Sequence, residues 1–304
     1  MHEPVLLQPL ITAVLTDPAG VYVDATFGRG GHSRALLAAL RSEARLLVID
    51  RDPEAVQVAA ELAATDPRVV VRHGRFGDLG AIAPAAGIAR ATGVMLDLGV
   101  SSPQLDDASR GFSFRSTAPL DMRMDRTTGR TAAALVNDAP EAELERIFRE
   151  FGEERYARRI ARAIAERRVA QPIATTADLA EIVAAAQPRP DPHKHAATRV
   201  FQALRIAVND ELDEVARGIA AAFELLLNGG RLGVISFHSL EDRIVKRTFA
   251  QWVSGPATPR RLPMRGGPVS RAFHLSKPVR ADAAEVARNP RARSAILRVV
   301  EKRA

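Results

Sequence analysis

The segment Val23-Asp24-Ala25-Thr26-Phe27-Gly28-Arg29-Gly30-Gly31-His32-Ser33 places three glycines between an apolar run and a helical pattern. Val21–Phe27 has the composition of a buried strand, and Ser33–Leu40 has helical spacing. Glycines at such a junction let a ligand approach the helix N-terminus closely. Asp50 ends the next predicted strand, where a carboxylate accepts hydrogen bonds from ribose hydroxyls. The segment therefore predicts a nucleoside cofactor.

Strands and helices alternate on both sides of this segment. The other expected strands are Leu46–Asp50, Val69–His73, Gly93–Leu98, Arg231–Phe237 and Ala295–Glu301. The helices between them are Pro53–Ala64, Glu211–Leu227 and Leu240–Trp252, and Ser254–Ala281 reads as a loop. Apolar strands that alternate with helices predict a parallel sheet covered on both faces, as in Rossmann-like α/β folds.

The pattern between about Asp106 and Asn209 is different, because it contains no convincing strand. Helical spacing occurs in four segments, which are Glu141–Phe151, Glu154–Arg168, Ala177–Ala186 and Ala196–Val208. We therefore predict an inserted all-helical domain over residues 106–208. Residues 1–105 and 209–304 would together form the α/β domain.

Composition narrows the class of protein. The chain has 304 residues, 46% hydrophobic and 26% charged, which is ordinary for a globular protein. It has no cysteine, which excludes disulfides, thiolate nucleophiles and cysteine zinc sites. No apolar run approaches the ~18 residues of a membrane span, and no signal peptide is recognisable. The absence of cysteine fits a reducing compartment, and we expect no membrane partner.

Two residues indicate which nucleoside cofactor binds. Ser33 stands where a dinucleotide fingerprint has its third glycine. Asp24, four residues before Gly28, disfavours a pyrophosphate and suits a cationic ligand. S-adenosylmethionine carries a sulfonium and an ammonium but no phosphate, so it is the expected cofactor. A nicotinamide-dependent oxidoreductase is the alternative.

The fourth predicted strand carries the candidate catalytic residues. Ligands bind at the carboxyl ends of parallel strands, and this strand ends in Asp97, followed by Ser101, Ser102 and Gln104. These side chains can accept the hydrogens of an amino group on a nucleobase and so orient it for methylation. Without cysteine, methylation through attack on a pyrimidine carbon is disfavoured. The plainer alternative is that Asp97 caps a turn.

Other candidate site residues have a possible structural role as well as a possible functional role. His32 would contact the cofactor or cap its helix, and Phe76 would pack on adenine or belong to the core. His238 ends a buried strand and is the best histidine candidate for a substrate contact. His193 and His195 have no further ligand nearby in the sequence, so no metal is expected.

The basic residues suggest a polyanionic partner. There are 43 Lys+Arg against 36 Asp+Glu, a net charge of +7. Arginines without acidic neighbours gather towards the C-terminus, and these are better phosphate-binding candidates than amphipathic helices. The predicted substrate-binding residues are Arg123, His238, Arg260, Arg261, Arg291 and Arg293.

Several longer motifs together resemble one family closely. They are His2–Leu7, Asp24–Ser33, Asp97–Asp106, Gly111–Phe114, Asp121–Asp125, Ser236–Arg243 and Asn289–Ser294. The chain resembles the bacterial 16S ribosomal RNA cytosine-N4 methyltransferases of the MraW type over nearly its whole length.

This resemblance implies a class I methyltransferase sheet and methyl transfer from S-adenosylmethionine to N4 of one cytidine in the decoding region of 16S rRNA. It also implies a cytoplasmic enzyme that acts on the small ribosomal subunit rather than on DNA, and a substrate domain in the helical block. The family's cofactor contacts correspond to Gly30, Gly31, His32, Asp50, Phe76, Asp97 and Gln104.

One motif departs from many DNA amino-methyltransferases. They carry an aromatic residue where Gln104 follows Ser102-Pro103, and that ring stacks on the target base. Phe112, Phe114 or Tyr156 would have to replace it. A non-catalytic RNA-binding assembly factor remains an alternative, and the oligomeric state is open, with a homodimer among the options.

Overall fold

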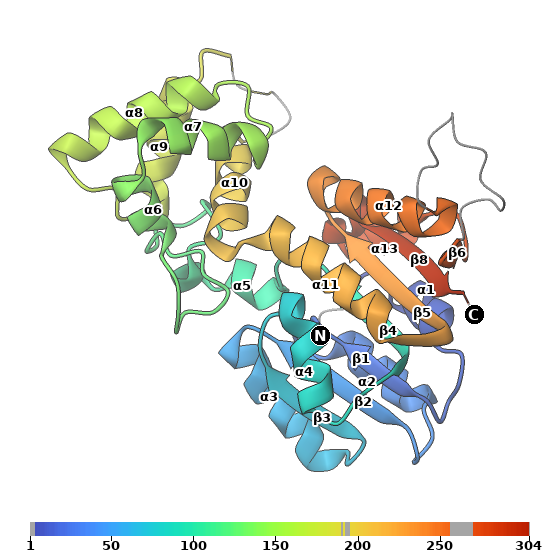
Figure 1. Ribbon diagram of the computed structural model, residues 1–304. Coiled ribbons are helices and arrows are strands. Elements are labelled where there is room, and N and C mark those ends of the chain that lie inside the picture. Colours follow the sequence, from blue (N-terminus) through green and yellow to red (C-terminus); the bar gives the residue numbers. More distant parts are fainter. Residues whose placement is uncertain (1–3, 190, 192–194, 256–269, 304) are drawn as a thin grey trace, which may run out of the picture. The chain divides into compact units, whose positions relative to one another are not determined.

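The computed structural model describes residues 4–189, 191, 195–255 and 270–303. Contacts between Cα atoms divide the chain into two compact units (Figure 1). The first unit comprises residues 1–99 and 212–304, and the second comprises residues 100–211. The sequence predicted the junctions at 105/106 and 208/209, so the divisions differ by a few residues.

The first unit contains a sheet of eight strands within the described residues, in the order β3-β2-β1-β4-β5-β8-β6, with β7 also paired to β8. The strands are β1 (Val21–Asp24), β2 (Arg45–Asp50), β3 (Val69–His73), β4 (Ala91–Asp97), β5 (Leu226–Ser236), β6 (Ala272–His274), β7 (Val279–Arg280) and β8 (Ile296–Lys302). The strands β3, β2, β1, β4 and β5 are parallel to one another, and β8 is antiparallel to β5, to β6 and to β7. The predicted Rossmann-like α/β sheet is confirmed.

Two apolar layers cover the sheet because its strands are apolar on both faces. In β2, Leu47 and Ile49 belong to one buried cluster, while Leu46 and Val48 belong to the other. One layer includes α4 (Leu79–Ala85), α11 (Glu211–Leu225, in this unit from Leu212) and α12 (Ser239–Ser254). The other includes α1 (Leu7–Val14), α2 (Gly31–Ala39), α3 (Pro53–Thr65) and α13 (Ala283–Arg288). The short helices η1 (Phe76–Asp78) and η3 (Pro290–Ser294) complete the unit.

Three local predictions about this unit were wrong. Residues 270–281, expected to be loop, include β6 and β7, and α1 was missed. The helix expected over Glu211–Leu227 ends at Leu225, and Asn228-Gly229-Gly230, which follows the expected helix, lies inside β5. There the register jumps, since Ala91 pairs with Leu226 but Gly93 pairs with Arg231, and Gly229 has a φ of 77°. The glycines serve an irregular strand rather than a helix end.

The second unit is helical, and among its described residues the only β pairing is an isolated bridge between Pro119 and Thr175. Its helices are α5 (Ser102–Asp106), η2 (Ala108–Arg110), α6 (Ala132–Asp138), α7 (Glu141–Glu150), α8 (Ala157–Ala170), α9 (Thr176–Ala186) and α10 (Thr198–Asn209). They enclose an apolar core of their own. Searching the described part of both units finds no helix with the length and apolarity to cross a bilayer.

Candidate active site

The loop between β1 and α2 can form only because glycines occupy it. Gly28 and Gly30 have φ values of 56° and 76°, which side chains rarely adopt. A Cβ atom at Gly30 would lie 2.6 Å from the Phe27 ring, and one at Gly31 would lie 2.1 Å from the Pro4 ring. A Cβ atom at Gly28 would meet no described atom within 4 Å. The loop is therefore closely packed at two glycines and open at the third.

Asp50, at the end of β2, is tied to this loop. Its Oδ2 accepts the Gly28 N–H at 2.7 Å, and its Oδ1 accepts the Asp52 N–H at 2.8 Å. Burial raises the pKa of Asp50 to about 6, although these two hydrogen bonds act to lower it. Each carboxylate oxygen can accept a second hydrogen bond, so the pair of oxygens is placed to accept ribose hydroxyls.

Asp97 ends β4, which is the neighbour of β1 in the sheet. Its backbone N–H donates to Thr26 Oγ1 at 2.7 Å. Its Oδ1 atom is covered and has no hydrogen-bond partner among the described residues. Burial raises the pKa of Asp97 to about 6. A covered acceptor without a donor is costly in a folded protein, and such atoms mark places that a ligand completes.

Asp24 is engaged by the protein itself. Ser33 Oγ donates to its Oδ2 at 2.6 Å, and the Thr26 N–H donates to its Oδ1 at 3.2 Å. The residue is 2% exposed, and burial raises the pKa of its carboxyl group. Asp24 therefore fixes the start of α2 through Ser33. Its predicted contact with the cofactor stays a prediction.

Phe76 begins η1 and packs against α11. A Cβ atom at Gly218 would lie 2.3 Å from the Phe76 ring, so the ring rests on the helix backbone. On the same helix, buried Glu214 accepts hydrogen bonds from Arg51 at 2.8 Å and from Arg75 at 3.1 Å. These contacts fix the residue that follows Asp50 and the residue that precedes Phe76. The sequence analysis did not identify Glu214, because an acidic residue beside an apolar one is ordinary in an amphipathic helix.

Ser101, Ser102 and Gln104 belong to the second unit, at the start of α5. The Gln104 side chain is buried, and its Oε1 accepts the Ser101 N–H at 3.0 Å in a capping box. The contacts within this unit thus give Gln104 a local role in forming the helix. The predicted catalytic and cofactor roles of these three residues stay predictions.

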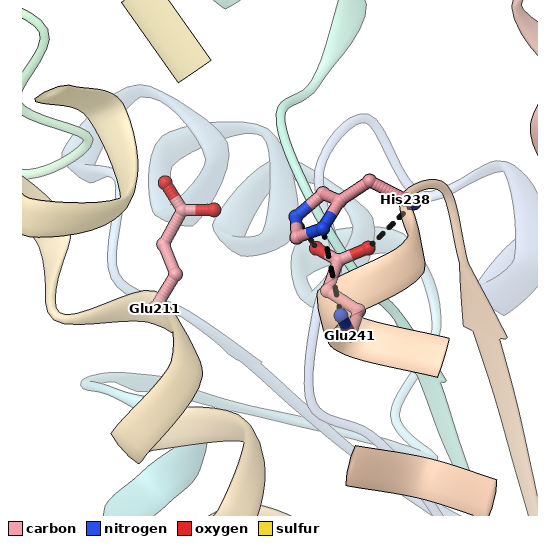
Figure 2. Close-up of side chains that lie close together, drawn as sticks. All are labelled: Glu211, His238 and Glu241. Carbon is pink, nitrogen blue, oxygen red and sulfur yellow. Dashed lines mark hydrogen bonds and ion pairs between the residues drawn. The ribbon is translucent and has the colours of Figure 1, made fainter. Parts of the chain in front are cut away.

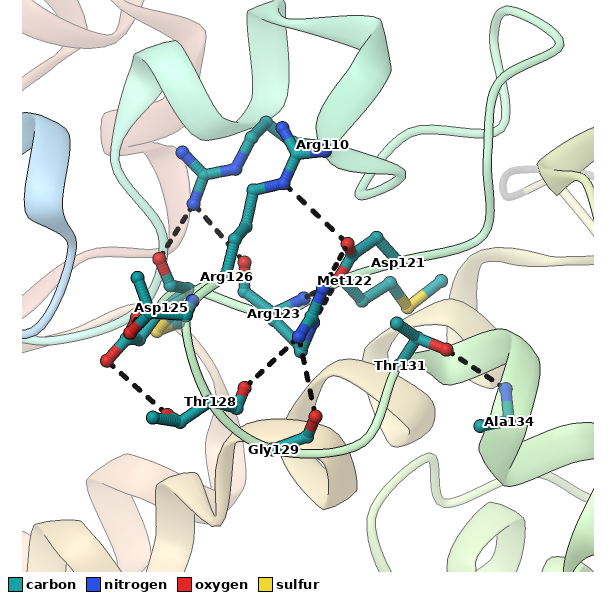
Figure 3. Close-up of polar contacts among 12 residues, drawn as sticks. Arg110, Asp121, Met122, Arg123, Asp125, Arg126, Thr128, Gly129, Thr131 and Ala134 are labelled. Carbon is teal, nitrogen blue, oxygen red and sulfur yellow. Dashed lines mark hydrogen bonds and ion pairs between the residues drawn. The ribbon is translucent and has the colours of Figure 1, made fainter.

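Arg123 is held inside its own loop (Figure 3). It makes two parallel hydrogen bonds to Asp121, of 2.8 and 3.0 Å, and its Nη1 donates to the carbonyls of Thr128 and Gly129. Burial raises the pKa of Asp121, but the bonds and charge of Arg123 outweigh it and hold that pKa below the usual value. Loop formation already uses much of this guanidinium, which was predicted to bind RNA.

His238 immediately precedes α12 and is bound to Glu241 (Figure 2). Its Nε2 lies 3.1 Å from Glu241 Oε1, and the Glu241 N–H reaches its Nδ1 at 3.5 Å. Glu241 Oε2 in turn accepts the N–H of Phe237 at 2.9 Å. The ring thus helps to cap the helix. The predicted contact of His238 with the substrate stays a prediction.

The structure describes only some of the arginines that were predicted to bind RNA. Arg293 is exposed and Arg291 is half-buried, and both lie in η3. Arg260 and Arg261 lie outside the described residues.

The residues of the first unit fit S-adenosylmethionine. The Gly28 N–H is occupied by Asp50, so it is not presented to a phosphate. The carboxylate of Asp24 beneath the loop would repel one. Asp50 and the unpartnered Oδ1 of Asp97 instead offer acceptors, which suit hydroxyl and ammonium groups.

Comparisons with known proteins agree with this geometry. The model of the MraW methylase family matches residues 1–303. The ribosomal RNA small subunit methyltransferase H of Chromohalobacter salexigens is 54% identical over 304 residues, which cover 99% of this chain and 91% of that protein.

Solved structures are more distant. An rRNA methylase from Streptococcus thermophilus has a TM-score of 0.42 and 10% identity, covering 97% of this chain and 92% of that one. A SAM-dependent O-methyltransferase from Thermotoga maritima has a TM-score of 0.42 and 10% identity, covering 100% and 68%. Likeness at this level adds nothing to the sequence relationship.

The extent of the family match decides against the oxidoreductase and against a non-catalytic assembly factor. The protein is an S-adenosylmethionine-dependent methyltransferase, and it belongs to the MraW methylase family.

Proposed function

We propose that this enzyme methylates the exocyclic N4 of a cytidine in the decoding region of 16S rRNA. The observation that carries the proposal is the 54% identity to a ribosomal RNA small subunit methyltransferase across almost the entire length of both chains. Such a substrate is polyanionic, which agrees with the net charge of +7. It would also place the enzyme in the cytoplasm.

The cofactor-binding residues in this proposal are Asp24, Gly28, Gly30, Gly31, His32, Asp50, Phe76, Asp97 and Gln104. The glycine loop gives close approach to backbone, Asp50 accepts from the ribose, and Phe76 packs on the adenine. When bound, S-adenosylmethionine supplies an electrophilic methyl group on a sulfonium.

The task of the protein residues is to orient an amine whose lone pair is delocalised into the base. Asp97 Oδ1, which has no partner among the described residues, accepts an N–H, and Ser101 and Ser102 add further acceptors in our proposal. No protein nucleophile is needed for transfer to nitrogen. The absence of cysteine from the chain fits that chemistry.

RNA recognition is proposed for the second unit and for the basic residues of both units. Arg293 is the best candidate, since it is exposed in η3. The side chains of Arg123 and His238 have local contacts in the protein that RNA binding would have to tolerate or exchange. Arg291, also in η3, donates its backbone N–H to Asn289.

The test is methyl transfer from labelled S-adenosylmethionine to small ribosomal subunits from cells that lack this enzyme, followed by nucleoside analysis. We expect label in N4-methylcytidine and in no other nucleoside. Label in a different nucleoside, or none despite tight cofactor binding, would refute the proposed acceptor. Parallel assays with naked 16S rRNA and assembled subunits identify the form that the enzyme accepts.

A further inference from the structure

The ring of His32 lies between two oxygen atoms of the first unit. Its Nε2 lies 3.1 Å from the backbone carbonyl oxygen of Val5, and both residues are buried. Its Nδ1 lies 3.7 Å from Asp97 Oδ2, which is ion-pair distance but longer than a hydrogen bond. The histidine therefore joins the segment before α1 to the end of β4.

The Val5 contact fixes where the ring carries hydrogen. A carbonyl oxygen can only accept, so Nε2 must be the protonated nitrogen. If His32 is neutral, its Nδ1 lone pair faces Asp97, and two acceptors would then oppose each other. A proton on either Nδ1 or Asp97 Oδ2 removes that conflict.

Asp97 has no other side-chain anchor in the described chain. Its backbone N–H is held by Thr26, but neither carboxylate oxygen receives a protein hydrogen bond. The direction of the carboxylate therefore depends on the group that faces Oδ2, and that group is His32.

We propose that His32 is a positioning residue: one proton, carried either by its Nδ1 or by Asp97 Oδ2, lets the two groups face each other and keeps Asp97 Oδ1 free to accept an N–H of the bound reactants. The Val5 carbonyl selects the tautomer that makes this sharing possible. The pair keeps its single proton throughout, so no net proton transfer is assigned to it. The inference rests on the proposed function for its reactants, but the shared proton is a property of the free enzyme.

The groups facing Asp97 define the expected pH dependence. Burial raises the pKa of Asp97, the charge on His32 of α2 lowers it, and Asp24 of β1 and Glu241 of α12 raise it further. Replacing His32 by a neutral residue removes the lowering contribution. The pKa of Asp97 should then rise, and Oδ1 should lose its role as acceptor at a higher pH.

The variant that tests this is His32→Gln, because glutamine keeps an N–H donor for Val5 but cannot carry the proton. We expect kcat at pH 7 to fall roughly tenfold or more with a smaller change in KM for S-adenosylmethionine. The acid limb of the kcat profile should move up by about one pH unit. His73→Gln is the matched control, since His73 Nε2 also contacts a backbone carbonyl, that of Arg51, at 3.0 Å.

A second measurement does not depend on RNA or on turnover. Nitrogen NMR of the wild-type free enzyme should show His32 protonated at Nε2, and the carboxyl carbon of Asp97 should titrate at higher pH in His32→Gln. A neutral ring protonated at Nδ1, or an Asp97 titration and acid limb unchanged by the substitution, would overturn the proposal. If the NMR results hold while N4-methylcytidine is not formed, the proposed acceptor fails and the shared proton stands.

Discussion

The strand ends of the first unit that carry Asp50 and Asp97 and the Asp121–Arg123 loop of the second unit use the same residue types in opposite ways. At these strand ends, burial raises the pKa of Asp50 and Asp97 to about 6, and among the described residues no arginine lowers either pKa. In the loop, Arg123 pairs with Asp121 through two hydrogen bonds and lowers its pKa. The carboxylates of Asp50 and Asp97 thus keep oxygen atoms available as acceptors, whereas the oxygen atoms of Asp121 are paired with Arg123.

The difference teaches which charges serve folding and which serve binding. A paired carboxylate stabilises the folded chain, whereas a covered and unpaired one destabilises it and is retained where a ligand completes it. Both regions are rich in Asp, Arg and Gly, so composition alone does not separate them.

The largest expected effect comes from Asp97→Asn, which keeps the size of the side chain but replaces one acceptor by a donor. We expect kcat to fall about 100- to 1000-fold, because the reacting amine loses its orienting acceptor. RNA affinity, measured by filter binding, should change far less. Equal losses in kcat and in RNA affinity would contradict a catalytic role.

Asp50→Ala should weaken S-adenosylmethionine binding about 10- to 100-fold, since charged hydrogen bonds to the ribose are lost. Calorimetric titration measures this directly. Asp66→Asn is the control, because Asp66 is paired with Arg68 as the loop carboxylate is with Arg123. An Asp50→Ala enzyme with unchanged affinity would remove Asp50 from the site.

Stability should change in opposite directions in the two regions. Asp97 is harder to ionise in the folded chain, so its contribution to stability falls as pH rises from about 4 to above 6. Asp97→Asn should therefore stabilise the protein at pH 7.5 by about 1 kcal/mol. Asp121→Asn should destabilise it by about 2 kcal/mol, because the two hydrogen bonds of Asp121 to the half-buried Arg123 are weakened or lost.

The check is how the free energies of unfolding of the Asp97→Asn and Asp121→Asn variants depend on pH, measured by urea unfolding. The stabilising effect of Asp121 is present above its unfolded pKa and is lost as pH falls through its lower folded pKa. The gap between Asp121→Asn and wild type should therefore narrow below about pH 4. Two variants that shift stability in the same direction at pH 7.5 would contradict the contrast.

The smallest expected effect is that of Gly218→Ala, which acts on the site through Phe76. The added methyl group would lie 2.3 Å from the ring and must displace it, so cofactor affinity should fall several-fold. Gly80→Ala in α4 is the matched control, since its methyl group would meet Ala221 at an ordinary 3.8 Å. Equal affinities of the two variants would show that Phe76 does not support the cofactor.

Sequence patterns predicted the sheet and the helical insertion, because Leu46–Ile49 and similar runs are apolar at every position. The short elements were missed for a physical reason. α1 has the apolar spacing of a helix at Leu7, Leu10, Ile11 and Val14, but it is only eight residues long. β6 is held by its pairing with β8 rather than by its own composition.

The site was predicted at the level of residue types rather than contacts. Gly28, Asp50 and Asp97 follow from the ends of strands, which a sequence reveals. The bond between His32 and the Val5 carbonyl joins residues 27 positions apart, and that between Arg51 and Glu214 joins residues 163 apart. No local pattern encodes such pairs.

The position of the second unit within the chain has a consequence for biosynthesis. β4 ends at Asp97, and its partner β5 begins at Leu226, about 130 residues later. At a synthesis rate of about 5–20 residues per second, β4 remains without its partner β5 for on the order of ten seconds while the ribosome completes residues 100–211. The helical unit, being continuous, can fold during that interval. The sheet that carries Asp97 is therefore completed last, when β8 emerges and pairs with β5.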